Sequence, residues 1–323
     1  MKLISIITPC YNEEENVELC YRRVKDVFAP MTQYRYEHIF IDNASHDKTA
    51  EILRRLAAED KNVKVILNSR NYGHIRSPYH AMLQSHGDAV MILSADLQEP
   101  PELIPQFVEP WAAGHKIVLG VKVQSDESPV MFAIRKFYYR LVKRLSEIEL
   151  INNYHGFGLY DRSIVEMLRQ MDDPYPYFRG QIAELGFDPV KIEYGQPQRE
   201  RGITKNNFYS LYDMAMLGIT SHSKVPLRLA TFTGFCVGLL SLLVAFGYFI
   251  YKLVFWNNFQ VGMAPLVIGI FFLSAVQLFF IGILGEYIGA IHTQVLHRPL
   301  VVEKERINFD APSTPVQGAR DIH

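Results

Sequence analysis

Residues Ala89–Leu103 read AVMILSADLQEPPEL. The first residues of this stretch are apolar and predict a buried strand. Pro100 and Pro101 predict the start of a helix, because proline suits the first helical turn. Asp96, Gln98 and Glu99 lie between the strand and the helix. The stretch therefore predicts a buried strand with a polar cluster at its carboxyl end.

The same alternation of strand and helix extends over the first 122 residues. Apolar runs predict strands at 3–9, 36–45, 63–68, 88–96 and 115–122, and helical spacing predicts helices at 12–28, 47–60, 77–87 and 100–114. Asn12 is the expected N-cap of the first helix, and Pro78 is expected in the first turn of the third. Near-continuous apolar strands predict a parallel sheet covered by helices on both faces, so the fold class is α/β.

The net charge, the cysteine spacing and the absence of two common motifs argue against several classes of function. The formal net charge of -1 gives no basic field for nucleic acid. Three cysteines lie far apart without a CxxC, which predicts neither a disulfide framework nor a zinc site. There is no GxGxxG after the first strand and no GxxxxGK[ST], so a dinucleotide oxidoreductase and a P-loop NTPase lose their usual support.

Two uncharged segments, Leu229–Tyr251 and Val261–Gly285, are each long enough to cross a bilayer as a helix. Buried core helices are the alternative, although such helices are usually shorter and carry a polar face. Basic residues precede the first segment and follow the second: Lys224, Arg228, His297, Arg298, Lys304 and Arg306. This bias predicts a hairpin in the cytoplasmic membrane with both chain termini in the cytosol, and Tyr251 and Trp256 at the interface.

The strand ends offer three polar clusters, TPCYNEEE, IDNASHDKT and SADLQEP. On an extended segment Asp96 and Gln98 point the same way and present hard oxygen ligands for Mg²⁺ or Mn²⁺ beside phosphates. The alternative is a capped turn before the next helix. Asp42 can accept from a ribose hydroxyl or a base N–H, or form an Asx turn. Tyr11 can stack on a base and Glu13 can bind sugar hydroxyls, with an ordinary strand-to-helix turn as the alternative.

Taken together, PxYNE, xDxxSxDxT and SADLQEPPE resemble family 2 glycosyltransferases of the GT-A fold. The resemblance is closer to polyisoprenyl-phosphate glycosyltransferases, the group of dolichol-phosphate mannose synthase. SRNYGH at 69–74 is similar to the S-R-N-F-G-K segment of that group. HSKVPLRLAT and GILGEYIG resemble its two-span bacterial members. The resemblance covers the chain up to about Glu303, and the order and spacing of the five motifs are specific.

The resemblance implies inverting transfer of a sugar from a nucleotide-sugar, UDP-linked, to a polyprenyl phosphate, undecaprenyl phosphate in a bacterium. The implied donor-binding residues are Pro9, Tyr11, Glu13, Asp42 and Lys122, and the implied metal ligands are Asp96 and Gln98. A phosphate monoester is already an anion at neutral pH, since its second pKa is about 6. The acceptor therefore needs positioning and charge neutralisation rather than a strong base.

Four basic residues are predicted to flank the phosphates near the membrane. Arg135 and Lys136 lie in 132–145, which has the pattern of a basic amphipathic helix. Arg201 and Lys205 lie in 198–207, which resembles the R-x-x-G-x-S-K segment over the donor and lipid phosphates. A solvated surface charge is the alternative for each, and Arg179 is a further candidate. The predicted catalytic residues are Asp96, Arg135 and Lys205.

The chain departs from the family pattern at several positions. Ser94 stands where an acid is frequent, and Gly156 replaces the acid of Gly-Asp-Phe, so the role of that acid is not carried over. Asn43 and Ala44 replace Asp-Gly, and Lys122 replaces an arginine. These departures concern the donor sugar and metal affinity rather than the fold.

The predicted organisation is a cytosolic GT-A domain over 1–206, a juxtamembrane amphipathic helix over 207–224, a transmembrane hairpin over 225–292 and a cytosolic tail over 293–323. Glycines in the hairpin favour a homo-oligomer. Two other functions stay open. One is direct transfer to a glycolipid or polysaccharide, although the chain has no Q-x-x-R-W. The other is an inactive, membrane-anchored scaffold that binds nucleotide-sugars, which Ser94 and Gly156 keep open.

Overall fold

The computed structural model describes residues 1–122, 151, 154–195, 216, 223–255 and 263–309. They belong to two compact units. The α/β unit contains the described residues up to 195 and again from 298, and the helical unit contains those from 216 to 297.

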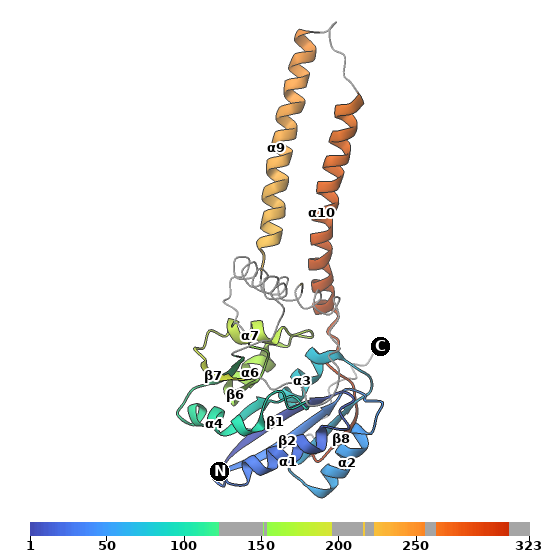
Figure 1. The fold of residues 1–323 in the computed structure, drawn as a ribbon. Helices are drawn as coiled ribbons and strands as arrows, with labels where there is room; N and C mark the ends of the chain where they lie inside the picture. Colours follow the sequence, from blue (N-terminus) through green and yellow to red (C-terminus); the bar gives the residue numbers. More distant parts are fainter. Residues whose placement is uncertain (123–150, 152–153, 196–215, 217–222, 256–262, 310–323) are drawn as a thin grey trace, which may run out of the picture. The chain divides into compact units, whose positions relative to one another are not determined.

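An eight-stranded sheet forms the centre of the described α/β unit (Figure 1). Its strands are β1 Lys2–Cys10, β2 Tyr34–Asp42, β3 Val63–Asn68, β4 Ala89–Ile92, β5 Ile117–Lys122, β6 Gly158–Asp161, β7 Val190–Tyr194 and β8 Glu303–Ile307. Their order in the sheet is β7-β5-β6-β4-β1-β2-β3-β8. Strands β6 and β8 are antiparallel to their neighbours, and the other pairings are parallel. The prediction of a mostly parallel α/β sheet is confirmed.

Helices cover both faces of this sheet. They are α1 Val17–Phe28, α2 Thr49–Glu59, α3 Gly73–Gln84, α4 Ile104–Ala112, α6 Arg162–Met171 and α7 Phe178–Glu184, with a 3-10 turn, η1, at Pro101–Leu103. Within β1, Ile4 and Ile6 pack in a core with α1 and α4, whereas Ile7 packs in a second core with α3 and α6. Each such fully buried isoleucine contributes about 2 kcal/mol relative to an exposed one.

Strand β1 marks the place where the strand order reverses. It pairs with β2 on one side and with β4 on the other, because β4 follows β3 in the chain but returns to the far side of β1. In open α/β sheets a ligand crevice forms at such a point, beyond the carboxyl ends of the strands. The three polar clusters named above follow β1, β2 and β4, so the topology brings them to this edge.

Three predicted boundaries are wrong in detail. Helix α1 begins at Val17 with Asn16 as its N-cap, whereas Asn12 has a left-handed φ of 55°. Helix α3 begins at Gly73, so Pro78 lies inside the helix rather than in its first turn. Strand β4 ends at Ile92, before the acidic residues begin. The loops after β1, β3 and β4 are therefore each longer than the sequence pattern predicts.

The segment over 293–323, predicted as a cytosolic C-terminal tail, contains a strand of the sheet. Residues Glu303–Ile307 form β8, which pairs antiparallel with β3 at the edge of the sheet. Arg54 forms an ion pair of 2.7 Å with Glu305, and His80 Nε2 lies 2.6 Å from a carboxylate oxygen of Glu303. Charged pairs with distant residues thus hold this strand, which explains why an apolar pattern does not reveal it.

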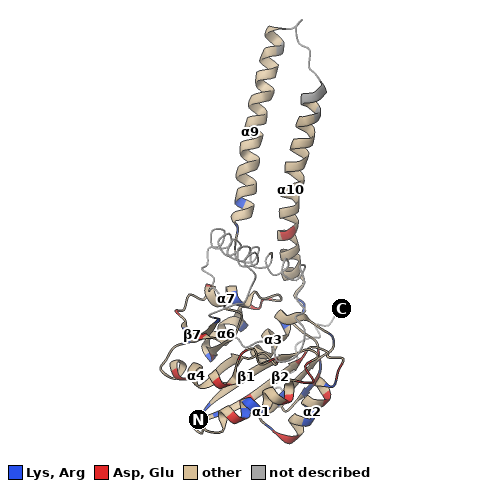
Figure 2. Cartoon of the chain, viewed as in Figure 1, with Lys and Arg blue, Asp and Glu red and all other residues tan. Residues whose placement is uncertain are grey.

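The helical unit contains two long apolar helices, α9 Val225–Val254 and α10 Met263–Val295. Their most apolar parts, Val225–Tyr251 and Ile268–Val295, have mean hydropathies of 2.2 and 2.3 and are long enough to cross a membrane. Figure 2 shows that acidic and basic residues cluster in the α/β unit and are sparse along α9 and α10. The predicted two-helix hairpin is confirmed. Helix α9 extends past the predicted 229–251 at both ends, and α10 extends past the predicted 261–285 at its C-terminal end.

Other predictions concern residues that the structure does not describe. The juxtamembrane helix at 207–224 lies largely outside the described residues, as does Trp256. The homo-oligomer stays a prediction.

Candidate active site

Hydrogen bonds between the loops after β1 and β2 close the first corner of the site. The N–H of Asn12 donates to Ser45 Oγ over 2.8 Å, and Asn12 Oδ1 accepts from the N–H of His46 over 2.8 Å. The N–H of Glu13 donates to Thr49 Oγ1 over 2.9 Å. These bonds fix Asn12 in its left-handed conformation and make the two loops one rigid corner.

The predicted nucleoside-binding residues lie at this corner. Pro9 pairs with Ile41 near the ends of β1 and β2, and the Tyr11 ring meets the His46 ring edge to face at 6.5 Å. The Glu13 carboxylate accepts from Asn16 Nδ2 over 2.6 Å. Pro9 belongs to β1, and Tyr11 and Glu13 belong to the strand-to-helix turn considered as the alternative. The contact of all three with a nucleoside stays a prediction.

Asp42 is only 2% exposed at the end of β2. Its two carboxylate oxygens accept from the N–H and the hydroxyl of Ser45. Burial raises the pKa of Asp42, and the two hydrogen bonds from Ser45 oppose that rise. The Asx turn is thus formed, and the carboxylate offers a ligand little surface in this conformation.

Asn43 joins β2 to the loop that precedes α3. Its Nδ2 donates to Asn71 Oδ1 over 2.9 Å and to the carbonyl oxygen of Gly73 over 3.0 Å. Its Oδ1 accepts from the N–H of Tyr72 over 2.8 Å and from Asn68 Nδ2 over 3.2 Å. An aspartate could not make the two donations. The family's Asp-Gly is therefore replaced here by an amide that ties the SRNYGH segment to the sheet.

Ala44 follows with a φ of 60°, in the left-handed region. Glycine reaches this region at little cost, whereas a residue with a Cβ is strained there. Ala44 therefore occupies a backbone conformation that a glycine would adopt at less cost.

The loop after β4 forms a compact turn rather than an extended segment. Leu97 has a φ of 58° and is only 4% exposed. The N–H of Gln98 donates to Asp96 Oδ1 over 3.2 Å, and the N–H of Ser94 donates to Glu99 Oε2 over 3.0 Å. Burying leucine gains about 2 kcal/mol, which offsets roughly 1–2 kcal/mol of left-handed strain. The expectation that Asp96 and Gln98 share one side of an extended segment is wrong.

Negative charge gathers in this turn. Burial raises the pKa of Glu99, and the nearby Asp96 carboxylate raises it further. The same negative charge affects Tyr194 of β7. Burial raises the pKa of Tyr194 most, and the charges of Glu99 and Asp96 raise it further. Two carboxylates held this close cost free energy when both are ionised. A cation bound here would remove that cost.

The residues of this turn fit a divalent ion that is only partly coordinated by protein. The described residues contain no group of three or more His, Cys, Asp or Glu side chains arranged to hold a metal. Asp96 and Gln98 would supply two hard oxygens, and a nucleotide diphosphate and water would have to supply the remaining ligands. Such sharing is usual for Mg²⁺, which keeps several waters and binds through substrate phosphates.

Comparison with known proteins gives two family matches. The model of glycosyl transferase family 2 matches residues 5–169, and that of the GtrB C-terminal hairpin matches residues 225–291. The bactoprenol glucosyl transferase of Shigella phage SfV is 34% identical over 302 residues, 93% of this chain and 98% of that protein. The chain belongs to glycosyl transferase family 2.

Further relatives and structures are similar over much of the chain. The prophage bactoprenol glucosyl transferase homolog of Escherichia coli K12 is 31% identical over 93% of this chain and 98% of its own length. Glucosyl-3-phosphoglycerate synthase from Mycobacterium tuberculosis, solved with Mn²⁺, UDP and phosphoglyceric acid, is 20% identical. It covers 68% of this glycosyltransferase and 76% of its own chain, with a TM-score of 0.47.

Gly156 and Asp161 clarify a second departure of this glycosyltransferase from its family. Gly156 has a φ of 107°, which strains any residue with a Cβ, and its carbonyl oxygen accepts from the Tyr160 hydroxyl over 3.0 Å. Asp161 caps α6 through Ser163 and accepts from Trp111 and Lys116 over 2.9 Å each. Burial opposes its ionisation, but these hydrogen bonds lower its pKa to about 2. Asp161 is a structural acid and does not substitute for the one missing at 156.

The predicted basic residues are only partly described. Lys122 is the last residue of β5 and pairs with Tyr194 of β7, at the same sheet edge as the acidic turn. Arg179 lies in the first turn of α7, where it donates to the carbonyl oxygen of Tyr154 over 3.4 Å. Arg135, Lys136, Arg201 and Lys205 lie outside the described residues, so their roles stay predictions.

Sequence reasoning assigned no role to three residues whose surroundings the structure distinguishes. In the sequence, Asn43 stands out only because it replaces the aspartate of Asp-Gly. Glu99 stands out only as one member of the acidic cluster after the fourth predicted strand. Arg76, in the first turns of α3, stacks over Tyr175 with its Cζ 5.0 Å from the ring centroid, and its buried Nε has no hydrogen-bond partner among the described residues. Nothing in the local sequence distinguishes Arg76 from a surface arginine.

Proposed function

We propose that this family 2 glycosyltransferase moves a sugar from a UDP-linked nucleotide-sugar to a polyprenyl phosphate, with inversion at the anomeric carbon. The observation that carries the proposal is one chain that joins this family's catalytic unit to a GtrB-type hairpin. Relatives that match it over 93% of its length are named bactoprenol glucosyl transferases. The hairpin gives a reason for a lipid acceptor, since its helices are long enough to span a bilayer.

The loops after β1 and β2 form the nucleoside part of the proposed site. Tyr11 stacks on the base, Asp42 accepts a hydrogen bond from the base or ribose, and Glu13 binds sugar hydroxyls. The hydrogen bonds of Asn43 hold the loop before α3 against the end of β2, and this keeps the nucleoside part of the site in place. Because Asp42 is buried, nucleoside binding must open the Ser45 cap, a local change at the corner.

The loop after β4 forms the diphosphate part. Asp96 and Gln98 would hold Mg²⁺ or Mn²⁺, which would supply charge stabilisation for the leaving diphosphate. Lys122 approaches the same phosphates from the end of β5. The acceptor phosphate is already an anion near neutral pH, so the chain needs no acid at position 156 to deprotonate it. Arg135, Lys136, Arg201 and Lys205 are proposed to neutralise the acceptor and donor phosphates.

The proposed location is the cytoplasmic membrane, with the catalytic unit and both termini in the cytosol. Lys224 and Arg228 at the start of α9 and Arg298 after α10 support this orientation through the positive-inside bias.

The test is turnover by the full chain in nanodiscs with undecaprenyl phosphate, Mg²⁺ or Mn²⁺, and a panel of UDP-sugars that begins with UDP-glucose. We expect a glycosylated lipid phosphate of inverted anomeric configuration, detected by mass spectrometry and NMR. Undecaprenol, which lacks the phosphate, serves as the matched control acceptor and should give no product. Absence of product with every donor would contradict the proposal and leave the binding scaffold.

A further inference from the structure

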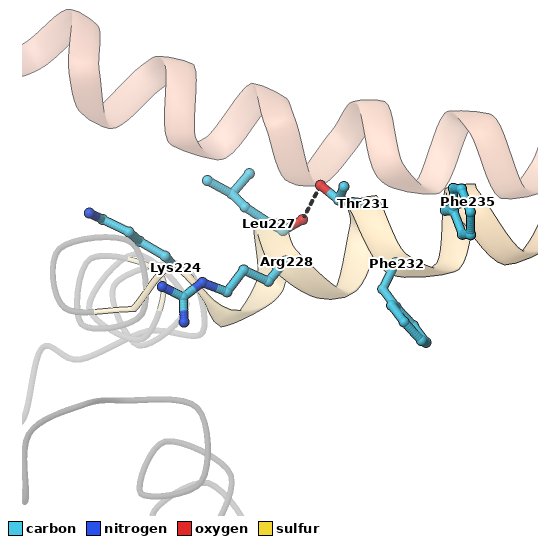
Figure 3. Close-up of a pocket in the computed structure, with 6 residues that line it drawn as sticks. All are labelled: Lys224, Leu227, Arg228, Thr231, Phe232 and Phe235. Carbon is cyan, nitrogen blue, oxygen red and sulfur yellow. Dashed lines mark hydrogen bonds between the residues drawn. The ribbon is translucent and has the colours of Figure 1, made fainter.

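Arg76 of α3 carries a charged group that is partly buried. Its Nε is buried and has no hydrogen-bond partner among the described residues. Arg228 shows the more usual situation: it is exposed beside Lys224 at the start of α9, in an open groove of about 540 Å³ (Figure 3). Water can solvate an exposed guanidinium, whereas a buried N–H without a partner costs free energy. The Arg76 Nε therefore needs an acceptor that the described residues do not supply.

Arg162 shows how the chain compensates a similar arginine elsewhere. Its Nη1 is also buried without a hydrogen bond within the described residues. That nitrogen lies 3.6 Å from a carboxylate oxygen of Glu166, and Nη2 donates to the carbonyl oxygen of Ser85 over 2.6 Å. No ion pair formed between described residues includes Arg76. The contrast indicates that the acid for Arg76 comes from a ligand.

Tyr175 holds the guanidinium of Arg76 by its face. The Arg76 Cζ lies over the Tyr175 ring, 5.0 Å from its centroid. The N–H donors of a guanidinium lie in its plane, so contact with a ring leaves them directed sideways. A carboxylate can accept two such N–H groups in parallel. Arg76 is therefore suited to bind a planar anion.

Arg76 and Tyr175 lie at the carboxyl edge of the parallel strands. Helix α3 begins there, because the carbonyl oxygen of Gly73 accepts from Asn43, directly after Asp42. Strand β6 is antiparallel to β4, so α6, which follows it, returns to the same edge and leads into Tyr175. Helical side chains lean toward the N-terminus of their helix. Arg76 thus leans toward the edge where the ligand crevice forms.

Arg76 and the acidic turn lie on different faces of the sheet. Tyr79, one turn after Arg76, packs in the core that α3 and α6 share with Ile7. Leu97 of the acidic turn packs instead in the core with α1 and α4. The diphosphate is proposed to bind at the acidic turn, so an anion held by Arg76 is a second anionic group of the ligand.

Ring contacts connect α3 to the segment before β6. The Phe178 ring meets the Tyr79 ring edge to face at 6.1 Å and the Tyr160 ring at 5.2 Å. The Tyr160 hydroxyl donates to the carbonyl oxygen of Gly156. Gly156 has no side chain, so the acid that the family pattern places there is absent. A negatively charged ligand group meets no like charge from this position.

We propose that the sugar transferred by this enzyme carries a carboxylate and that Arg76 binds it. The donor is then a UDP-linked uronic acid. Arginine offers only donors, so a carboxylate matches it better than a sugar hydroxyl, whose own proton needs a further acceptor. The proposal rests on the proposed function for the nucleotide-sugar and makes Arg76 the residue that determines donor specificity.

The test compares two pairs of donors that differ only at C6: UDP-glucuronate with UDP-glucose, and UDP-galacturonate with UDP-galactose. The full chain is assayed in nanodiscs with Mg²⁺ and undecaprenyl phosphate. We expect KM for at least one uronate to lie at least about tenfold below that of its neutral partner, because the charge-assisted pair is the stronger one. Equal KM values within both pairs in the wild type would overturn the proposal, and this comparison needs no variant to fold.

Arg76→Gln removes the charge and should abolish the preference. We expect it to raise KM for the uronate and to leave KM for the neutral donor within about twofold. Arg76→Lys keeps the charge without the fork and should retain part of the preference. Arg55→Gln, at an exposed arginine of α2, is the matched control and should keep the whole preference. An equal rise in KM for all four donors would overturn the proposal, since Arg76 would then not recognise the sugar.

Calorimetric binding of the donors with Mg²⁺ and without acceptor separates this proposal from the proposed function. Tighter binding of a uronate that is lost in Arg76→Gln, even where no lipid phosphate is glycosylated, would support the proposal and refute the function. Turnover without any preference in binding or KM would overturn the proposal and leave the function. UDP alone should bind equally to the wild type and to Arg76→Gln, and weaker binding to the variant would overturn the assignment to the sugar.

Discussion

The loops after β2 and β4 follow the two strands that flank β1, and they are built in opposite ways. After β2, Asn43 uses its amide in four hydrogen bonds, and both oxygens of Asp42 accept from Ser45. After β4, the carboxylates of Asp96 and Glu99 lie in one turn, and the charge of Asp96 adds to burial in raising the pKa of Glu99. The first corner is fixed by the protein itself, whereas the second concentrates charge that a ligand can neutralise.

The largest expected effect comes from Asp96. In Asp96→Asn the turn keeps its shape but loses the charge proposed to hold the metal and diphosphate. We expect transfer to fall by about 1000-fold, equivalent to roughly 4 kcal/mol of transition-state stabilisation. Steady-state kinetics with undecaprenyl phosphate measures it. Glu102→Gln, which changes an exposed acid in η1, is the matched control. Equal rates in the two variants would contradict the claim that the loop after β4 concentrates charge for a ligand.

Asn43→Asp tests the rigidity of the first corner. The change removes both donations, to Asn71 and Gly73, and places a charge in a buried network. We expect the free energy of unfolding to fall by about 2 kcal/mol, the usual cost of unsatisfied buried polar groups. Urea denaturation of the detergent-solubilised chain measures this loss. Asn62→Asp, at an exposed position, should change stability little, and equal effects at the two sites would show that the Asn43 network is not special.

Gly156→Asp introduces the acid that the family pattern led us to expect at this position and forces a side chain onto a φ of 107°. We expect about 1–3 kcal/mol of destabilisation from backbone strain and no gain in rate. Gly156→Ala carries the strain without the carboxylate and is the matched control. A rate above wild type in the aspartate variant alone would show that this chain lacks a base it needs.

Glu99→Gln gives the smallest effect and depends on pH. The folded protein raises the pKa of Glu99, so its ionised form is disfavoured once the pH exceeds the ordinary value of about 4.3. The variant should therefore be more stable than wild type at pH 7 by about 1 kcal/mol or less, and equally stable below pH 4. Thermal unfolding across pH measures this difference. A variant that is less stable at pH 7 would show that the two acids do not oppose each other.

The sequence predicts the parts of this molecule that rest on local apolar patterns. Strands β1 and β3 and helices α9 and α10 contain apolar runs whose period and length indicate their type directly. Strand β8 has no such run: its charged side chains are held by Arg54 and His80, more than two hundred positions away in the chain. Pairings of that kind have no local signal.

In the candidate site, too, local sequence predicts which residues are present but not how they are arranged. The acid and amide after β4 are visible in sequence because a buried strand ends beside them. Their arrangement is not, because Leu97 adopts a left-handed backbone so that its side chain can be buried. Asn43 similarly owes its role to Asn68, Asn71 and Tyr72, and the Asp42 cap depends on Ser45. Burial and tertiary hydrogen bonds decide these features.

The claim that a ligand completes the β4 loop is tested most directly by Mn²⁺ binding, followed by electron paramagnetic resonance with and without UDP. The account predicts that UDP strengthens Mn²⁺ binding to the wild-type chain and that Asp96→Asn abolishes this strengthening. Mn²⁺ binding that is independent of UDP, or that is unchanged in Asp96→Asn, would contradict it.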